Sequence, residues 1–139
     1  MSDNKLVLVN GCFDLLHAGH IALLKTARAN ARGGFVFVAI DSDRRVQELK
    51  GPTRPIVCAN DRKEMLLACR YVDKVYEFDT DQELLNLYRV LKPDVTVKGL
   101  EYLTKAFIGS KYCKEIIFHD STKHRTTEII NEAARAGSG

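Results

Sequence analysis

The sequence predicts an α/β protein built on a doubly wound, five-stranded parallel sheet. Segments rich in Val, Ile and Phe alternate along the chain with segments of helical period. One of the apolar segments, FVFVAI (35–40), shows no polar alternation, which is typical of a strand buried on both faces. This alternation favours parallel strands joined by helical crossovers. We therefore expect one domain over residues 1–136, with a flexible tail or cloning remnant at 137–139.

The first half of the chain predicts two strands with a helix between them. KLVLVN (5–10) is a short run rich in β-branched residues that ends at Asn-Gly. IALLKTARANAR (21–32) has apolar residues at helical spacing and is stopped by a Gly-Gly pair. After the strand at 35–40, residues 41–57 predict one helical turn and then a loop punctuated by Gly and Pro.

The second half predicts three more strands and their crossover helices. ANDRKEMLLACRYV (59–72) is a helix capped by Asn60 or Asp61, and the amphipathic helix TDQELLNLYRVLK (80–92) stops before a proline. The remaining elements are strands at 73–78, 94–99 and 114–120, a short helix or loop at 101–113 and a closing helix at 126–136.

Composition limits the partners of the protein. The net charge of +3 comes from Lys and Arg spread along the chain, whereas nucleic-acid binding usually shows a concentrated basic face. No apolar run approaches the roughly 18 residues of a membrane helix, and the polar start MSDNK is not a signal peptide. The four cysteines match no zinc pattern and are typical of reduced thiols. We expect a cytoplasmic protein that binds small anions, with no nucleic acid and no membrane as partner.

The predicted topology locates a binding site. Ligands of doubly wound sheets bind beyond the carboxyl ends of the strands, at the point where the strand order reverses. The segments that follow the strands should therefore meet at one edge of the sheet, and these are residues 10–20, 41–54, 98–102 and 121–127.

The stretch NGCFDLLHAGH (10–20) places His17 and His20 on either side of Gly19 where a strand becomes a helix. A zinc site needs three or four ligands, and this motif supplies two, to which His119 and His124 could add. A helix cap with no further role is a second interpretation. A helix N-terminus attracts anions and glycine allows a close approach, so the residues favour the third interpretation, a phosphate site.

GCFDLLHAGH resembles the nucleotidyltransferase superfamily defined by an HxGH motif, the cytidylyltransferase-like group. The resemblance extends over almost the whole chain through LKGPTRPIV, RKEMLLACRYVDKVYEF, LKPDVTVKGLEY and HRTTEII. It is strongest to the adenylyltransferase domain that makes ADP-heptose from heptose 1-phosphate. The single-domain glycerol-3-phosphate cytidylyltransferase is nearly as similar.

This resemblance implies a Rossmann-like fold of the HxGH type and a nucleotidyltransferase. Such an enzyme moves an NMP group from an NTP to a small phosphorylated acceptor and releases pyrophosphate, with Mg²⁺ or another divalent cation accompanying the NTP. VKGxxY (97–102) favours ATP and a sugar phosphate such as heptose 1-phosphate. The alternatives are CTP with glycerol 3-phosphate or another small phosphate or phosphonate, and a nucleotide-binding module without catalysis. Relatives of this kind are often homodimers, so we expect a homodimer.

The resemblance also implies roles for single residues. His17, His20 and Lys50 are the expected catalytic residues, which grip the triphosphate near the α-phosphoryl group and the leaving phosphates. Asp14, Asp43 and Arg54 are expected at the acceptor, with Asp14 also a candidate partner of Mg²⁺. The expected nucleotide-binding residues are Gly11, Cys12, Phe13, Gly19, Arg62, Lys98, Gly99, Tyr102, Thr126 and Thr127.

Several of these positions have a plain structural interpretation as well. Asp14 could cap the turn, Tyr102 could be a core aromatic residue, and the two threonines could be an N-cap pair. Asp41 does not match the acidic family position, which falls on Asp43. Arg125 stands where relatives carry a serine before the two threonines.

Overall fold

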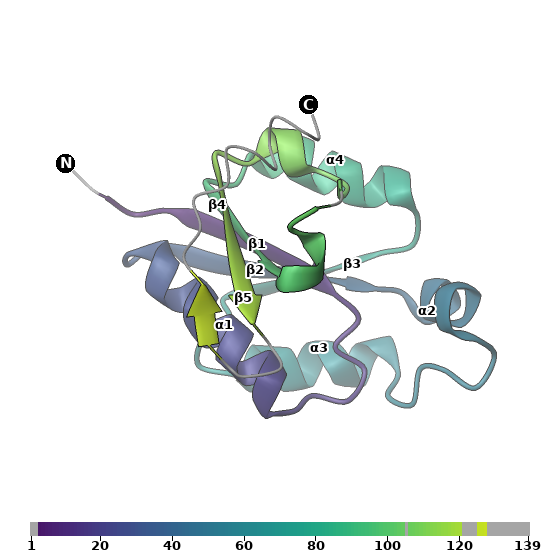
Figure 1. Ribbon diagram of the computed structural model, residues 1–139. Helices are drawn as coiled ribbons and strands as arrows, with labels where there is room; N and C mark the ends of the chain where they lie inside the picture. The colour runs from purple at the N-terminus through teal and green to yellow at the C-terminus, as the bar shows by residue number, and fades with distance from the viewer. Residues whose placement is uncertain (1–2, 105, 121–124, 128–139) are drawn as a thin grey trace.

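The computed structural model describes residues 3–104, 106–120 and 125–127 (Figure 1). Its centre is a six-stranded sheet in the order β3-β2-β1-β4-β5-β6. The strands are β1 (Leu6–Gly11), β2 (Phe35–Asp41), β3 (Lys74–Phe78), β4 (Val95–Gly99), β5 (Glu115–Asp120) and β6 (Arg125–Thr127).

Strands β1 to β5 are all parallel, which confirms the predicted five-stranded parallel sheet. The chain runs outward from β1 through β2 to β3, then returns to pair β4 with the other side of β1. The strand order therefore reverses between β1 and β4, and this is the point where a ligand is expected.

Helices cover both faces of the sheet, as a doubly wound fold requires. Val7 and Val9 of β1 pack in one core cluster with Leu24, while Leu8 packs in the other with Tyr88. In Figure 1, α1 and α3 lie on one side of the sheet and α4 on the other. The helices are α1 (Ala18–Ala31), α2 (Asp43–Lys50), α3 (Ala59–Ala68) and α4 (Asp81–Leu91), and two short 3-10 turns are η1 (Leu100–Tyr102) and η2 (Ser110–Tyr112).

Three helices differ from the prediction. Helix α3 ends at Ala68 rather than at residue 72, and its N-cap is Cys58, without a side-chain cap bond, and not Asn60 or Asp61. Helix α1 begins at Ala18 rather than Ile21, since His17 accepts a hydrogen bond from the Gly19 amide and starts the helix earlier. Helix α2 has two turns rather than one, because the Ser42 hydroxyl accepts from the Arg45 amide. The segment at 101–113 forms the two 3-10 turns and a loop, as predicted.

The end of the chain also departs from the prediction. The closing helix was expected to begin at Thr126, but residues 125–127 form β6, antiparallel to β5, with Thr126 opposite His119. β-branched threonines suit a strand, and β6 covers the edge that β5 would otherwise expose. The rest of the predicted helix and the tail at 137–139 lie outside the described residues. Within the described part of the chain, no helix is long and apolar enough to cross a membrane.

Candidate active site

A cavity of about 580 Å³ opens at the carboxyl edge of the sheet. It is lined from the ends of β1, β2 and β4 and from α1 and α2, so three of the four predicted segments meet there. The fourth, 121–127, is described only at 125–127. Ten of the expected site residues line the cavity: Gly11, Cys12, Phe13, His17, Gly19, His20, Lys50, Lys98, Gly99 and Tyr102.

His17 and His20 are joined by a reciprocal capping box at the start of α1. The His17 Nδ1 accepts from the Gly19 amide at 3.0 Å, and the His20 Nδ1 accepts from the His17 amide at 3.2 Å. The two rings stack with their centroids 3.9 Å apart. The predicted cap and the predicted site thus coincide, because the capping bonds use Nδ1 while both residues line the cavity.

The hydrogen bonds fix how the two rings present their protons. A nitrogen that accepts a hydrogen bond carries no proton, so each neutral ring holds its proton on Nε2. Burial, the neighbouring His17 ring and Lys50 together lower the pKa of His20 to about 4, against a small opposing effect of the Leu15 carbonyl. His20 is therefore a neutral Nε2–H donor at physiological pH, and not an imidazolium.

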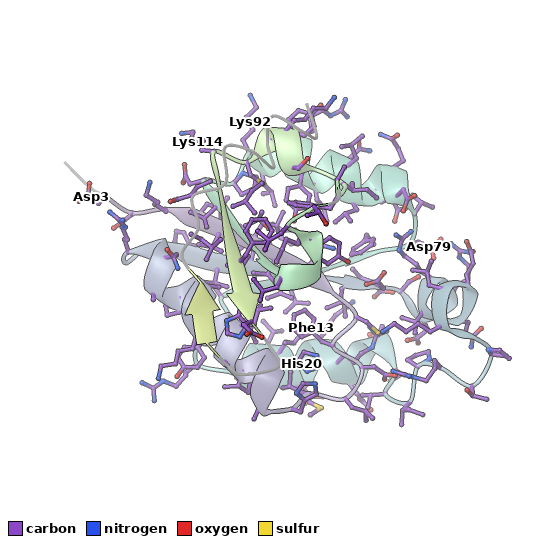
Figure 2. All side chains as sticks on the ribbon, in the orientation of Figure 1. Asp3, Phe13, His20, Asp79, Lys92 and Lys114 are labelled. Atoms are coloured by element: carbon purple, nitrogen blue, oxygen red, sulfur yellow. The ribbon has the colours of Figure 1, made fainter. Side chains whose placement is uncertain are left out.

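The backbone before the histidines makes a tight turn around Phe13. Phe13 has a left-handed φ of 51°, and its buried ring lies 5.0 Å from that of His20, with both side chains labelled in Figure 2. A Cβ on Gly11 would lie 3.0 Å from the Phe13 ring, closer than an ordinary van der Waals contact, so glycine gives the ring room. Burial raises the pKa of the Cys12 thiol, which makes it a poor nucleophile in this state.

Lys50 reaches the cavity from the last turn of α2. Its side chain is exposed, and it forms no ion pair with any of the described residues. The next residue, Gly51, ends the helix with a φ of 108° that disfavours any other residue. Lys50 is thus a cation without an ion-pair partner among the described residues, and it lines the same cavity as the two histidines.

Lys98 is held at the inner wall of the cavity, 6% exposed. Its Nζ donates to the Asn10 Oδ1 at 2.8 Å, and the Tyr88 hydroxyl donates to the same oxygen at 2.8 Å. The Lys98 ammonium also lies 5.2 Å from the ring centroid of Tyr102 and 4.5 Å from that of Phe107. Tyr102 is therefore half-buried yet faces the cavity, and not the core.

Asp14 does not line the cavity but holds the loop that follows α2. It is 4% exposed and accepts from the Arg54 Nε at 2.7 Å and from the amides of Ile56 and Val57. Burial raises the pKa of Asp14, but the two amides and the Arg54 guanidinium outweigh it and lower that pKa to about 2. The interpretation of Asp14 as a cap on the turn fits this geometry better than a direct contact with the acceptor. Arg54, which donates to Asp14, likewise holds the loop in this geometry.

Arg62 and Asp43 likewise lie behind the cavity wall. Arg62 is 1% exposed and donates to the carbonyls of Val57, Cys12 and Asp41, as well as to the Asp43 carboxylate at 2.8 Å. Its Nε, Nη1 and Nη2 atoms are all engaged, so the structure places it as a tie between three loops. A cation in the first turn of α3 opposes the helix dipole, but this position alone does not distinguish a ligand contact from internal hydrogen bonds.

Sequence reasoning missed Asn10, Asp41, Arg45 and Phe107, all of which line the cavity. Asn10 and Asp41 lie at the ends of buried strands, where a polar side chain is a usable signal. Arg45 follows Asp41 by one helical turn and pairs with it, a spacing that could have been recognised. Phe107 comes from an irregular loop and carried no signal.

Thr126 and Thr127 are described only by their backbone pairing in β6, so their expected role as phosphate ligands stays a prediction. Among the described residues, no group of three or more His, Cys, Asp or Glu side chains is arranged to hold a metal ion. Asp14 fits a metal poorly, because its oxygens already accept from Arg54 and two amides. Of the acidic residues, Asp41 lines the cavity.

A parallel α/β sheet with a paired-histidine helix start at its switch point defines the class of nucleotidyltransferases. The chain belongs to the cytidylyltransferase-like family, whose model matches residues 8–132.

The relatives agree with this membership. The chain is 44% identical over 132 residues to the bifunctional protein HldE of Campylobacter fetus and 41% identical over 132 residues to that of Helicobacter pylori strain P12. The matches cover 94% and 95% of this chain but only 28% of each relative, so the chain spans little more than a quarter of their length.

Solved structures show the same fold. The lipopolysaccharide core biosynthesis protein of Thermoplasma volcanium superposes with a TM-score of 0.61 and 25% identity, over 74% of this chain and 79% of that one. The pantothenate synthetase of Thermus thermophilus gives a TM-score of 0.57 at 14% identity, over 86% and 57% of the two chains, and supports the fold alone.

Proposed function

We propose that this protein transfers an NMP group from an NTP to a small phosphorylated acceptor and releases pyrophosphate. The observation that carries the proposal is the stacked pair His17 and His20, whose Nδ1 atoms are occupied by the helix cap while the rings line the cavity. Two Nε2–H donors at a helix N-terminus suit the phosphate oxygens that gain charge during the transfer.

The protein would act by alignment and charge stabilisation rather than through a covalent intermediate. The acceptor phosphate attacks the α-phosphorus, the bond from the α-phosphorus to the bridging oxygen breaks, and pyrophosphate leaves. His17 and His20 donate to oxygens of the α-phosphoryl group. Lys50, an exposed cation beside the Gly51 turn, covers the β- and γ-phosphates as they leave. The hydroxyls of Thr126 and Thr127 stay part of this proposal as further phosphate contacts.

The turn after β1 would supply backbone donors. Arg62 does not contact the substrate in this proposal. Its Nη1 donates to the Cys12 carbonyl oxygen at 2.9 Å and so fixes the direction of that carbonyl. Because a trans peptide points its C=O and N–H in opposite directions, this bond also fixes the direction of the Phe13 amide. Arg62, Asp14, Arg54 and Asp43 are thus proposed as positioning residues for the phosphate-binding turn and the loop after α2.

The nucleotide is proposed to be ATP and the acceptor a sugar phosphate, such as heptose 1-phosphate. VKGxxY supports this through its resemblance to adenylyl-transferring relatives, with Lys98, Gly99 and Tyr102 forming the β4 side of the cavity. The 41–44% identity to the HldE proteins, and a structural relative named for lipopolysaccharide core biosynthesis, favour a nucleotide-sugar product. Transfer from CTP to glycerol 3-phosphate is the alternative within the class.

Mg²⁺ is proposed to enter with the triphosphate, which supplies most of its oxygen ligands, as is usual for this ion. It would neutralise charge on the phosphates. The cytoplasmic location and the homodimer expected from the sequence belong to the same proposal, and light scattering on the purified protein measures the second.

The test is pyrophosphate release with Mg²⁺, ATP or CTP, and a panel of phosphorylated acceptors. We expect release with ATP and a sugar 1-phosphate, at a rate well above that with CTP. Faster release with CTP and glycerol 3-phosphate would establish the alternative. Tight NTP binding without release for any acceptor would contradict the proposal and favour a binding module.

A further inference from the structure

An ion pair forms the wall of the cavity on the β2 side, at the opposite flank from Lys98. Asp41 is the last residue of β2, and Arg45 follows one turn into α2. The Arg45 Nε donates to the Asp41 Oδ2 at 2.9 Å, and the two side chains are only 13% and 16% exposed. Both residues line the same cavity as His17 and His20.

Three further contacts restrain Arg45. Its Nη2 donates to the Asp81 Oδ1 at 2.6 Å, at the start of α4, and its guanidinium lies 5.1 Å from the centroid of the buried Phe78 ring. The third contact is at its backbone, where the Arg45 amide donates to the Ser42 Oγ at 3.1 Å. Arg45 is thus fixed from α2, β3 and α4, as a recognition group needs to be if little entropy is to be lost on binding.

The Asp41–Arg45 pair is held in place, but not all of its hydrogen-bonding atoms have partners. Among the residues that the structure describes, none accepts from the Arg45 Nη1 and none donates to the Asp41 Oδ1. One donor nitrogen of Arg45 and one acceptor oxygen of Asp41 therefore remain without a partner among the described residues, and both residues line the cavity. Arg62 and Asp14, which lie behind the cavity wall, differ in this respect, since Arg62 uses all its guanidinium nitrogens and Asp14 both its oxygens.

The position of the pair separates it from the nucleotide side. Lys98, Gly99 and Tyr102 follow β4 on one side of β1, whereas Asp41 and Arg45 follow β2 on its other side. The histidines lie at the end of β1, between the two flanks. A substrate that meets the NTP at the histidines from the β2 flank would pass its non-phosphate part along Asp41 and Arg45.

We propose that Asp41 and Arg45 form the subsite that recognises hydroxyl groups of the acceptor, and that they select polyol and sugar phosphates over phosphates without hydroxyls. One hydroxyl donates to the Asp41 Oδ1, and another hydroxyl accepts from the Arg45 Nη1. A site built for such hydrogen bonds discriminates against an analogue that lacks them, because its own polar groups then stay unpaired. This inference rests on the proposed function and assigns the acceptor class within it.

The experiment compares Asp41→Asn, Arg45→Gln and Arg45→Lys with the wild type. Arg44→Gln is the matched control, because Arg44 is the neighbouring arginine on α2, pairs with Asp79 and Glu48, and does not line the cavity. The probes are glycerol 3-phosphate, glucose 1-phosphate and, as the hydroxyl-free analogue, propyl phosphate. Calorimetry in the presence of α,β-methylene ATP measures acceptor affinity, and a titration with α,β-methylene ATP alone measures nucleotide affinity.

We expect the wild type to bind a hydroxylated probe about tenfold or more tightly than propyl phosphate. Arg45→Gln and Asp41→Asn should lose most of that preference while their affinity for α,β-methylene ATP stays within about twofold, since neither side chain is on the nucleotide side. Arg45→Lys, which keeps the charge but not the fork of donors, should be intermediate. Arg44→Gln should match the wild type.

An unchanged preference in Arg45→Gln and Asp41→Asn, or a wild type that binds no hydroxylated probe in preference, would overturn the inference. A parallel loss of nucleotide affinity in these variants would also overturn it, because the pair would then be structural. Pyrophosphate release by the wild type is followed separately. Its absence with every NTP, while the binding preference and its loss persist, would contradict the proposed function and leave the subsite standing.

Discussion

Two sets of polar side chains lie at or behind the wall of the same cavity, and they differ in the partners that their hydrogen bonds already have. His17, His20 and Lys50 line the cavity. The capping bonds of the two histidines use Nδ1, and Lys50 forms no ion pair with the described residues. Asp14 and Arg62 lie behind the wall, where loop backbone and neighbouring side chains occupy them fully.

The difference teaches that a charge near a site is not by itself a ligand contact. A buried charge must be paired, and the partners it takes inside the protein are withdrawn from the substrate. The lining set should therefore control turnover with little effect on folding. The bracing set should control folding first and turnover through it.

The largest effect is expected from His17→Asn, which separates the two roles of this residue. Asparagine is a good N-cap, so the side-chain oxygen can still accept from the Gly19 amide, but the Nε2–H donor is gone. Loss of a donor to a phosphoryl oxygen should lower kcat about 1,000-fold, with the thermal midpoint little changed. Pyrophosphate release and thermal unfolding measure the two; a kcat within tenfold of the wild type would place His17 in the bracing set.

Arg62→Met should have the opposite profile. Methionine fills the volume but leaves three carbonyls and the Asp43 carboxylate without their donor. We expect a loss of about 3 kcal/mol in the free energy of unfolding, measured by urea denaturation. Arg44→Met removes the same charge at an exposed position and should leave the free energy of unfolding nearly unchanged. Native stability with abolished turnover would mean that Arg62 contacts the substrate.

Lys50→Gln sharpens the comparison on the lining side. The exposed ammonium makes no ion pair within the described ranges, so its removal should leave stability unchanged and lower kcat about 30-fold. The control is Lys63→Gln, since Lys63 pairs with Glu77 outside the cavity and should affect neither quantity. Equal kinetics for the two variants would remove Lys50 from the proposed mechanism.

The smallest effect concerns the pH dependence of stability. One residue of each set has a pKa that folding lowers: His20 among the residues that line the cavity, and Asp14 among those behind its wall. The pKa of His20 falls from 6.5 to about 4 on folding, so the unfolded chain takes up a proton first and stability declines as the pH falls from 6.5 towards 4. The pKa of Asp14 falls from 3.8 to about 2, so a further loss of about 2 kcal/mol follows below pH 3.8.

Urea denaturation at a series of pH values measures both declines. His20→Asn should remove the decline above pH 4, and Asp14→Asn should remove the one below it. If His20→Asn still lost stability between pH 6.5 and 4, or Asp14→Asn still lost it below pH 3.8, the decline would not be caused by that residue. The two variants serve as controls for each other, because their windows hardly overlap.

The sheet was predictable because its evidence is local. FVFVAI predicts a strand buried on both faces, and its valines, Ala39 and Ile40 are buried while Phe35 at its start is exposed. The alternation of such segments with helices predicts the parallel order that the structure confirms. The apolar period places the start of α1 three residues too late, whereas the interpretation of His17 as a helix cap gives the correct start. Thr126 was expected in a helix, but long-range pairing with His119 decides its backbone.

The site was predictable only as far as topology reaches. Residues after β1, β2 and β4 had to meet at one edge, and most expected ligands do line the cavity. Sequence could not show that Asp43 turns to Arg62 while Asp41 faces the cavity, since two carboxylates two residues apart differ only in the partners that tertiary structure brings. The same holds for Asp14, whose bonds to the amides of Ile56 and Val57 span more than 40 residues.

The central claim is that His17 and His20 meet the nucleotide through Nε2 while Nδ1 serves the helix cap. Nitrogen-15 NMR of the histidine rings near neutral pH, before and after addition of Mg²⁺ and α,β-methylene ATP, tests it directly. We predict that both rings are Nε2–H tautomers in the free protein and that the Nε2 resonances shift on binding while those of Nδ1 stay in place. Saturating nucleotide with no change at either Nε2, or protons found on Nδ1, would contradict the account.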